Sequence, residues 1–315
     1  MTVALALIGG GLIALFVGAN ALIKGAAALA RRWGMAPLVV GLTVVAAGTS
    51  SPEFFVVTGA ALAGRDGISL GNILGSNSLN IGLILGLTAV VRPLQAQMQL
   101  IRFDVPIMIL ATLVVAAFIA DGRLGRVESA ALLAALLCYL GFTIYMARRE
   151  ANARVQEQFA AEVPGPLGSL AAELGLIALG LAALALGAQG LLSGAVTVAA
   201  AAGVSDSVIG ITVVAAGTTV PELITCLVAA LKREGDIAIG NIIGSNIFNL
   251  LGVLGLAGTL APISAAGVQP TELWGAVLLA ALSLPIMWRG QIVSRPEGAL
   301  LLALYVVYLA LIWNG

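Results

Sequence analysis

The sequence predicts an all-α membrane protein of ten transmembrane helices, arranged as two inverted repeats of five helices each. Three observations lead to this fold class. First, 60% of the 315 residues are hydrophobic and 10% are charged, whereas soluble domains carry roughly 25% charged residues. Second, apolar runs of about 20 residues, the length needed to cross a bilayer, follow one another along the chain. Third, two blocks of sequence recur at one constant offset.

The apolar runs place the ten spans, in chain order, near residues 3–29, 36–63, 68–90, 104–120, 127–147, 169–201, 205–231, 237–258, 270–288 and 297–313. The polar stretch 148–168 separates the fifth span from the sixth and contains a Pro-Gly-Pro sequence, so we expect a linker there. The predicted organisation is therefore a first five-helix repeat over 1–147, a linker over 148–168 and a second five-helix repeat over 169–315.

The repeated blocks relate the two halves. GLTVVAAGTSSPE at residues 41–53 and GITVVAAGTTVPE at residues 210–222 are identical at ten of thirteen positions, at an offset of 169. The block at residues 68–87 matches residues 237–256 at eleven of twenty positions, at the same offset. Because each half holds an odd number of spans, equivalent spans must cross the membrane in opposite directions. Such inverted repeats are typical of secondary transporters.

Loop charges predict the orientation of the chain. With the amino terminus outside, the inner loops carry eleven arginine and lysine residues and the outer loops carry three. Positive charge accumulates on the cytoplasmic side. We therefore expect a multi-pass protein of the inner (cytoplasmic) membrane, surrounded by the lipid bilayer, with both termini outside and the linker inside.

Two acidic residues, Glu53 and Glu222, lie deep inside predicted spans, whereas the other thirteen fall in loops or near span ends. An acid inside the membrane is costly and indicates function. Each follows a proline, Pro52 or Pro221, which lacks an N–H and breaks the helix. No lysine or arginine is predicted at the same depth, so a bound cation is the natural partner, and protonation is the alternative when the site is empty.

Oxygen-bearing groups surround these acids in the sequence. The breaks are expected to free carbonyls near residues 46–48 and 215–217, and hard cations such as Ca²⁺ and Na⁺ prefer oxygen ligands. A break or a polar residue in a span often has only a packing role, but the duplicated combination favours an ion site. The hydroxyl groups near the acids belong to Thr49, Ser50, Thr218 and Thr219. Polar residues spaced four apart lie on one helix face, and two such sets occur: Asn72, Ser76 and Asn80 in the first half, and Asn241, Ser245 and Asn249 in the second.

The motifs GTSSPE and GNILGSNSLN in the first half, with GTTVPE and GNIIGSNIFN in the second, resemble those of the calcium/cation antiporter superfamily, specifically the prokaryotic sodium/calcium exchangers. The resemblance covers both family repeats, their spacing and the span count. It implies a secondary antiporter that exchanges Ca²⁺ for Na⁺ by alternating access. It also implies that the first and sixth spans slide across the other eight.

The resemblance further implies a central site formed by the second, third, seventh and eighth spans. Glu53 and Glu222 would bind Ca²⁺ directly, in competition with Na⁺, and Thr49 and Thr218 would add oxygen ligands. The remaining implied ligands are the carbonyl of Ala46 with Ser50 and Ser76, the carbonyl of Ala215 with Thr219 and Ser245, and Asn80 with Asn249 in the middle.

One departure from the family pattern leaves alternatives open. Some members have aspartate at the position of Asn249, whereas both halves have asparagine here, at Asn80 and Asn249. Two carboxylates neutralise one Ca²⁺ or two Na⁺, and a third Na⁺ would leave a net positive charge. The stoichiometry is therefore open. A Ca²⁺/H⁺ or other cation/proton exchanger on the same scaffold is the alternative, and a cation channel is a remoter one.

Other function classes find no support in the sequence. The chain has no histidine and no deep Ser/Lys or Asp pair suited to nucleophilic catalysis, so we expect no enzyme. Its net charge is zero, which gives no electrostatic basis for binding nucleic acid. We expect no cofactor beyond the transported Ca²⁺ and Na⁺.

Overall fold

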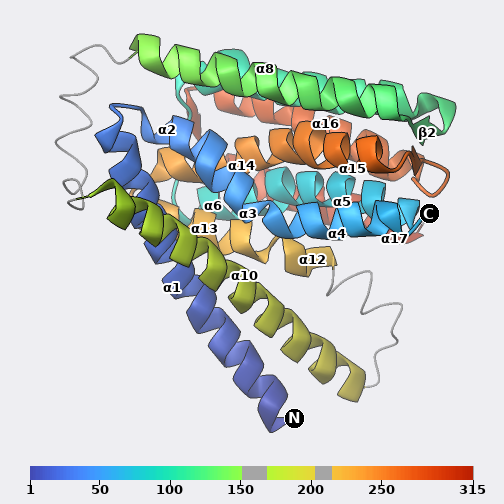
Figure 1. Cartoon of the computed structure of the whole chain (residues 1–315), viewed down its shortest axis with the longest axis horizontal. Coiled ribbons are helices and arrows are strands. Elements are labelled where there is room, and N and C mark those ends of the chain that lie inside the picture. The colour runs from blue at the N-terminus through green and yellow to red at the C-terminus, as the bar shows by residue number, and fades with distance from the viewer. Residues whose placement is uncertain (151–168, 203–214, 315) are drawn as a thin grey trace.

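The structure, a computed structural model, describes residues 1–150, 169–202 and 215–314 (Figure 1). Helices make up almost all of the described chain. The helices of the first half are α1 (Thr2–Arg32), α2 (Pro37–Val40), η1 (Gly41–Val45), α3 (Ala46–Thr49), α4 (Ser51–Leu62), α5 (Asp66–Leu79), η2 (Asn80–Leu85), α6 (Gly86–Val91), η3 (Leu100–Asp104), α7 (Val105–Phe118), η4 (Ile119–Asp121) and α8 (Arg126–Glu150).

The described part of the second half repeats this order, except that α16 has no counterpart of η3 before it or of η4 after it. Its helices are α10 (Leu170–Ala201), α12 (Ala215–Thr218), α13 (Val220–Leu231), α14 (Gly235–Ile247), η6 (Phe248–Val253), α15 (Leu254–Leu260), α16 (Pro270–Trp288) and α17 (Arg295–Asn314). The elements η1, η2, η3 and η6 are π-helical turns, a rare conformation that is frequent at functional sites.

The described residues confirm an all-α membrane protein. They contain eight helices that are long and apolar enough to cross a bilayer, and the bent pair Pro37–Thr49 and Ser51–Leu62 forms a ninth candidate. Part of the predicted span 205–231 and residues 151–168 of the predicted linker lie outside the described residues. The count of ten spans therefore stays a prediction.

Two predicted boundaries differ from the structure. The span expected at 104–120 begins at Leu100, because the helix continues through Arg102 and Asp104, whose charges hide it from hydropathy. Asp104 is buried and accepts a hydrogen bond of 3.0 Å from the hydroxyl of Tyr139. The linker expected from residue 148 begins later, because α8 extends to Glu150.

The central layer of the bundle consists of two composite helices. In an apolar 18-residue stretch of the span Gly235–Leu260 (α14, η6 and α15), 89% of the residues are buried, and in one of Asp66–Val91 (α5, η2 and α6) 72% are buried. The corresponding share in the other six long helices is between 22% and 39%, so these helices form the rim that faces lipid. Polar residues inside membrane proteins face the interior of the bundle, and the two central helices carry the repeated asparagine and serine motifs.

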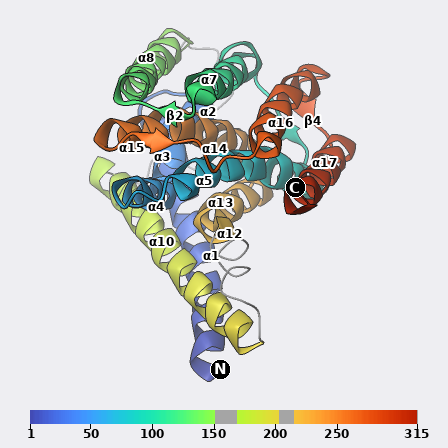
Figure 2. The same ribbon diagram turned by 90° about the vertical axis from the view of Figure 1, so that its right-hand side faces the viewer.

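Helices α1 and α10 form a separate antiparallel pair. Both views show them crossing the other helices obliquely, with their far ends projecting away from the bundle (Figures 1 and 2). The pair is held at glycines: a Cβ on Gly18 would lie 2.8 Å from the carbonyl oxygen of Gly180, and one on Gly11 would lie 2.7 Å from that of Gly187. Small residues at these crossings let the two backbones approach closely.

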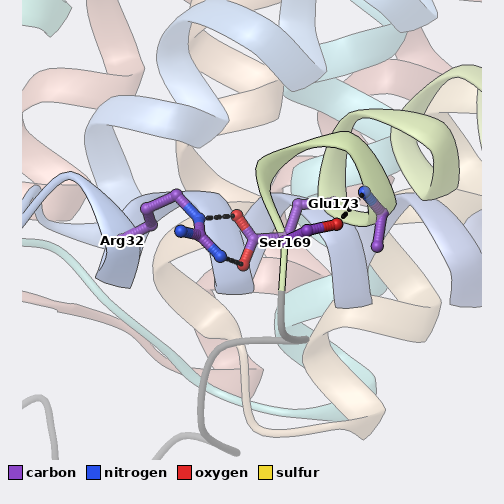
Figure 3. A network of polar contacts seen from close by, with 4 residues as sticks. Arg32, Ser169 and Glu173 are labelled. Atoms are coloured by element: carbon purple, nitrogen blue, oxygen red, sulfur yellow. Dashed lines mark hydrogen bonds and ion pairs between the residues drawn. The ribbon is translucent and has the colours of Figure 1, made fainter.

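An ion pair joins the end of α1 to the start of α10 (Figure 3). The guanidinium of Arg32 donates to the carboxylate of Glu173, from Nε to Oε2 at 2.6 Å and from Nη2 to Oε1 at 3.1 Å. Glu173 is fully buried, whereas Arg32 is 28% exposed. Ser169 is the N-cap of α10, and its side-chain oxygen accepts a hydrogen bond from the Ala172 N–H.

Two short antiparallel ribbons join the halves. Strand β1 (Leu94–Gln95) pairs with β4 (Ile292–Val293), and β2 (Arg123–Leu124) pairs with β3 (Ile263–Ser264). The register of the two ribbons is equivalent. Adding the offset of 169 to Leu94 and Gln95 gives Ile263 and Ser264, so the β1–β4 pairing becomes the β3–β2 pairing.

Candidate functional site

Each predicted break lies immediately before a glutamate. The helical segments Pro37–Thr49 and Ser51–Leu62 meet at Ser50 with a bend of 47°. Pro52 occupies the first turn of α4. Proline is tolerated at this position because the first turn has no intrahelical acceptor for its N–H. Glu53 thereby lies in the first turn of α4. In the second half, Thr219 separates α12 from α13 in the same way, with Glu222 in the first turn of α13.

Both carboxylates are buried and receive hydroxyl groups from the opposite half of the chain. Glu53 is 0% exposed and Glu222 is 1% exposed. Thr219 donates to Oε1 of Glu53 at 3.2 Å, and Ser50 donates to Oε1 of Glu222 at 3.4 Å. Ser76 also reaches Oε1 of Glu53, at 3.5 Å, and lies 3.2 Å from the Thr219 hydroxyl. The two breaks therefore face each other across one site.

The site contains oxygen atoms that have no hydrogen-bond donor. Within the described residues, Oε2 of Glu53 and Oε2 of Glu222 are buried without a partner, and so are Oδ1 of Asn80 and Oδ1 of Asn249. A buried acceptor without a donor is costly. The two carboxylates also interact electrostatically, and like charges held together in a dry interior repel strongly. A bound cation would satisfy these acceptors and remove the repulsion.

Thr49 links the first break to the central helix α14. Its hydroxyl donates to Oδ1 of Asn241 at 3.0 Å and lies 3.5 Å from the hydroxyl of Ser245. All three side chains are buried. The face expected from the four-residue spacing of Asn241 and Ser245 therefore meets the break of the opposite half.

The break does not free the carbonyl of Ala46. This carbonyl accepts the backbone N–H of Ser50 at 3.0 Å, because the helix keeps its hydrogen bond on the turn before Pro52. The Thr49 hydroxyl approaches the same oxygen at 3.5 Å. A carbonyl has two lone pairs, so one remains available to a cation.

The equivalent residues of the second half are partly described. Ala215 begins α12 directly after the undescribed residues 203–214. Thr218 and Thr219 are both buried, and both side chains form hydrogen bonds with the Glu53 carboxylate. Glu222 accepts the hydroxyl of Ser50 from the first half, so Thr218, Thr219 and Glu222 lie at the shared site.

Two asparagines of the site were not predicted from the sequence. Asn77 and Asn246 lie one residue after the serines of the repeated GSN motif, off the face that Asn72, Ser76 and Asn80 share. Each donates its Nδ2 to the backbone carbonyl of the other, at 3.2 Å and 3.4 Å. The sequence offered one indication of their role, because both repeats have asparagine at this position. Side-chain spacing on a single helix, however, does not reveal contacts between two helices.

An apolar groove lies elsewhere in the described structure. It has a volume of about 400 Å³ and lies between α7 and α8, and its lining includes Ile107, Leu110, Phe118 and Phe142. This lining is apolar apart from the edges at Tyr139 and Cys138. Such a surface offers a cation no set of oxygen ligands, so the groove is not the candidate cation site.

Known proteins resemble this chain over nearly its whole length. The chain matches the family described as sodium/calcium exchanger protein over residues 3–145 and 172–314. It is 34% identical over 318 residues to the inner membrane protein YrbG of Escherichia coli strain K12, covering 99% of this chain and 98% of that protein. It is 28% identical over 339 residues to the sodium/calcium exchanger MaX1 of Methanosarcina acetivorans, covering 96% of each.

Among solved structures, the chain resembles the sodium–calcium exchanger NCX_Mj soaked with zero Na⁺ and Ca²⁺. The TM-score is 0.86 at 30% sequence identity, and the match covers 99% of both chains.

Proposed function

Because the chain belongs to the sodium/calcium exchanger family, we propose that it exchanges Ca²⁺ for Na⁺ across a membrane by alternating access. One observation carries the proposal. Two fully buried carboxylates, on broken helices from opposite halves of the chain, each keep an oxygen without a hydrogen-bond donor. Hard cations bind carboxylate oxygens of this kind, and Ca²⁺ typically takes about 6–8 oxygen ligands.

The proposed Ca²⁺ ligands are Glu53 and Glu222, with oxygens from Thr49 and Thr218, and Asn80 and Asn249 closing the middle of the site. The burial of all six side chains supports this assignment. For the flanking Na⁺ sites we propose the carbonyl of Ala46 with Ser50 and Ser76, and the carbonyl of Ala215 with Thr219 and Ser245. The crossed hydrogen bonds of Ser50 to Glu222 and of Thr219 to Glu53 support a shared site.

Exchange would follow from the charge of the site. One Ca²⁺ or two Na⁺ would neutralise the two glutamates, and the neutral, occupied site could then pass between the two sides of the membrane. An empty site would hold two desolvated carboxylates, which is unfavourable. The transporter should therefore change sides only when it is loaded, and this restriction couples the flux of one ion to that of the other.

We propose that residues 1–147 and 169–315 are inverted repeats of five spans each, with the linker 148–168 between them. The family match falls into two segments that follow this division, 3–145 and 172–314. The glycine contacts between α1 and α10 also support it. Gly11 and Gly18 are equivalent to Gly180 and Gly187 at the offset of 169, and Gly11 meets Gly187 while Gly18 meets Gly180. If a two-fold axis relates the antiparallel helices α1 and α10, each glycine of one helix should meet the counterpart of the other glycine, as these contacts do.

The proposed location is the inner (cytoplasmic) membrane, with both termini outside and the linker inside. The printed name of the Escherichia coli relative, an inner membrane protein, supports the location. We further propose that α1 and α10 slide as a pair across the remaining helices. Their glycine contacts and the ion pair of Arg32 with Glu173 support movement as one unit.

The test is ⁴⁵Ca²⁺ uptake into proteoliposomes under three conditions: an outward Na⁺ gradient, an outward K⁺ gradient, or a pH gradient without Na⁺. An outward Na⁺ gradient should drive uptake, whereas K⁺ or a pH gradient alone should not. Uptake driven by the pH gradient without Na⁺ would instead identify a Ca²⁺/H⁺ exchanger. Flux that needs no counter-ion and exceeds carrier turnover would indicate a channel.

A further inference from the structure

Four asparagines of the repeated blocks form one hydrogen-bonded cluster between α5–η2 and α14–η6. They are Asn77 and Asn80 from the first half and Asn246 and Asn249 from the second. Each is at most 7% exposed. Side-chain amides have an oxygen and a nitrogen of nearly equal size, so hydrogen bonds decide which of the two atoms faces a given direction.

Backbone carbonyls orient the first two amides. The Nδ2 of Asn77 donates to the backbone oxygen of Asn246 at 3.2 Å, and the Nδ2 of Asn246 donates to the backbone oxygen of Asn77 at 3.4 Å. A backbone carbonyl can only accept, so each amide must turn its NH₂ group toward it. The Oδ1 atoms of Asn77 and Asn246 must then point the opposite way.

These two oxygens in turn orient the second pair of amides. The Oδ1 of Asn246 accepts the Nδ2 of Asn80 at 2.9 Å, and the Oδ1 of Asn77 accepts the Nδ2 of Asn249 at 3.1 Å. Only an NH₂ group can donate to these oxygens. The Oδ1 atoms of Asn80 and Asn249 therefore point away from the cluster, and both are buried without a donor.

The segments that carry these oxygens lie beside the glutamates. The π-helical turn η2, which begins at Asn80, packs against α13, the helix of Glu222. The turn η6, which contains Asn249, packs against α4, the helix of Glu53. The unpartnered amide oxygens thus belong to the same part of the core as the unpartnered carboxylate oxygens.

We propose that Asn77 and Asn246 are positioning residues that hold the ligand amides of Asn249 and Asn80 with their oxygens toward the transported cation. The inference rests on the proposed function and names two residues outside its ligand set. Without this support, a half-turn of either ligand amide would present an NH₂ group to the cation. Because the attraction between an ion and a dipole grows with the charge of the ion, Ca²⁺ loses more than Na⁺ from such a turn.

A double-mutant cycle tests the proposal with ⁴⁵Ca²⁺ binding to the purified protein. Asn246→Leu should weaken Ca²⁺ binding about 10-fold, the effect of roughly one hydrogen bond. In an Asn80→Asp background the same change should cost less than about 2-fold, because aspartate presents an oxygen in either orientation. In an Asn249→Asp background the full loss should remain, because Asn77, and not Asn246, orients residue 249.

An equal loss in all three backgrounds would overturn the proposal, since a general packing defect does not depend on residue 80. If the leucine variant is not recovered from membranes, Asn246→Ala removes the same hydrogen bonds without added bulk and enters the same cycle. Failure of the unsubstituted protein to bind Ca²⁺ would overturn the proposed function together with this inference. Normal Ca²⁺ binding with no coupling between residues 246 and 80 would overturn the inference alone.

Discussion

Glu53 and Glu222 each occupy the first turn of a helix, where free N–H groups and the helix dipole favour negative charge. This placement reduces the cost of a buried carboxylate but does not supply a partner for every oxygen. The same local sequence that breaks the helix therefore creates both a tolerable position for an acid and a need for a cation. The chemistry of the site begins with this combination.

Removing either charge should abolish exchange. In Glu53→Gln or Glu222→Gln, bound Ca²⁺ would keep an uncompensated charge in a dry site, a loss of about 3 kcal/mol or more. This corresponds to about 100-fold or more in Ca²⁺ affinity. Na⁺-driven ⁴⁵Ca²⁺ uptake in proteoliposomes measures the effect, and Asp121→Asn, at an exposed carboxylate at the end of η4, is the control. Robust uptake in both glutamine variants would refute the site assignment.

At the scale of elements, the contact between α1 and α10 depends on glycine. A Cβ on Gly180 would lie 2.6 Å from the backbone nitrogen of Leu22, which no side-chain movement can relieve. Some other glycines of α1 and α10 have open space around them. A Cβ on Gly10 would meet nothing within 4 Å, so the two glycines separate the effect of close packing from that of glycine itself.

We therefore expect Gly180→Ala to separate the two helices and to cost about 1–3 kcal/mol of stability, as overpacking usually does. Gly10→Ala should change stability by less than about 0.5 kcal/mol. Thermal unfolding of the purified protein, together with Na⁺-driven Ca²⁺ uptake, measures both variants. Equal behaviour of the two variants would show that close approach at Gly180 is unimportant.

The ion pair between Arg32, at the end of α1, and Glu173, at the start of α10, leads to a separate prediction. Arg32→Gln would remove the two hydrogen bonds and the charge of the Arg32 guanidinium from the fully buried carboxylate of Glu173, so the melting temperature should fall. The double variant Arg32→Gln/Glu173→Gln removes both charges and should recover most of the loss. If the double variant is less stable than the single variant, the penalty does not come from the loss of the Arg32 charge opposite Glu173.

At the scale of the whole molecule, the two ribbons and the α1–α10 contacts relate the halves by one offset. The β1–β4 ribbon follows from the β3–β2 ribbon by the same shift of 169 residues that relates the two glutamate motifs. In the proposed arrangement, two copies of one unit facing in opposite directions would bring equivalent breaks together inside the membrane. Such symmetry would explain how a single duplicated motif can build both sides of one site.

The proposed orientation predicts which loops face which side. In a Cys138→Ala background, the only native cysteine left is the buried Cys226. A cysteine introduced at Ala266 should then react with a membrane-impermeant thiol reagent added outside spheroplasts. A cysteine at Ala153, in the predicted linker, should react only after permeabilisation. Permeabilised cells provide the control that both thiols are reactive. Labelling of both positions from the same side would contradict the proposed topology.

Sequence reasoning anticipated much of this architecture, for identifiable reasons. Hydropathy located the helices to within a few residues, and it failed at Leu100, where Arg102 and Asp104 interrupt an apolar run that is nevertheless helical. The prolines at 52 and 221 correctly marked the breaks. Of the carbonyls predicted to be freed near residues 46–48, that of Ala46 is not free, because it keeps its hydrogen bond from the Ser50 N–H.

The sequence by itself determined the membrane class, the positions of the breaks and the two deep acids, because hydropathy, proline and charge act locally along the chain. The tertiary structure alone decided which groups meet: Thr219 with Glu53, Ser50 with Glu222, and Asn77 with Asn246. Each of these contacts crosses between the two halves. Their geometry depends on how whole helices cross, and side-chain spacing within a single helix contains no information about that crossing.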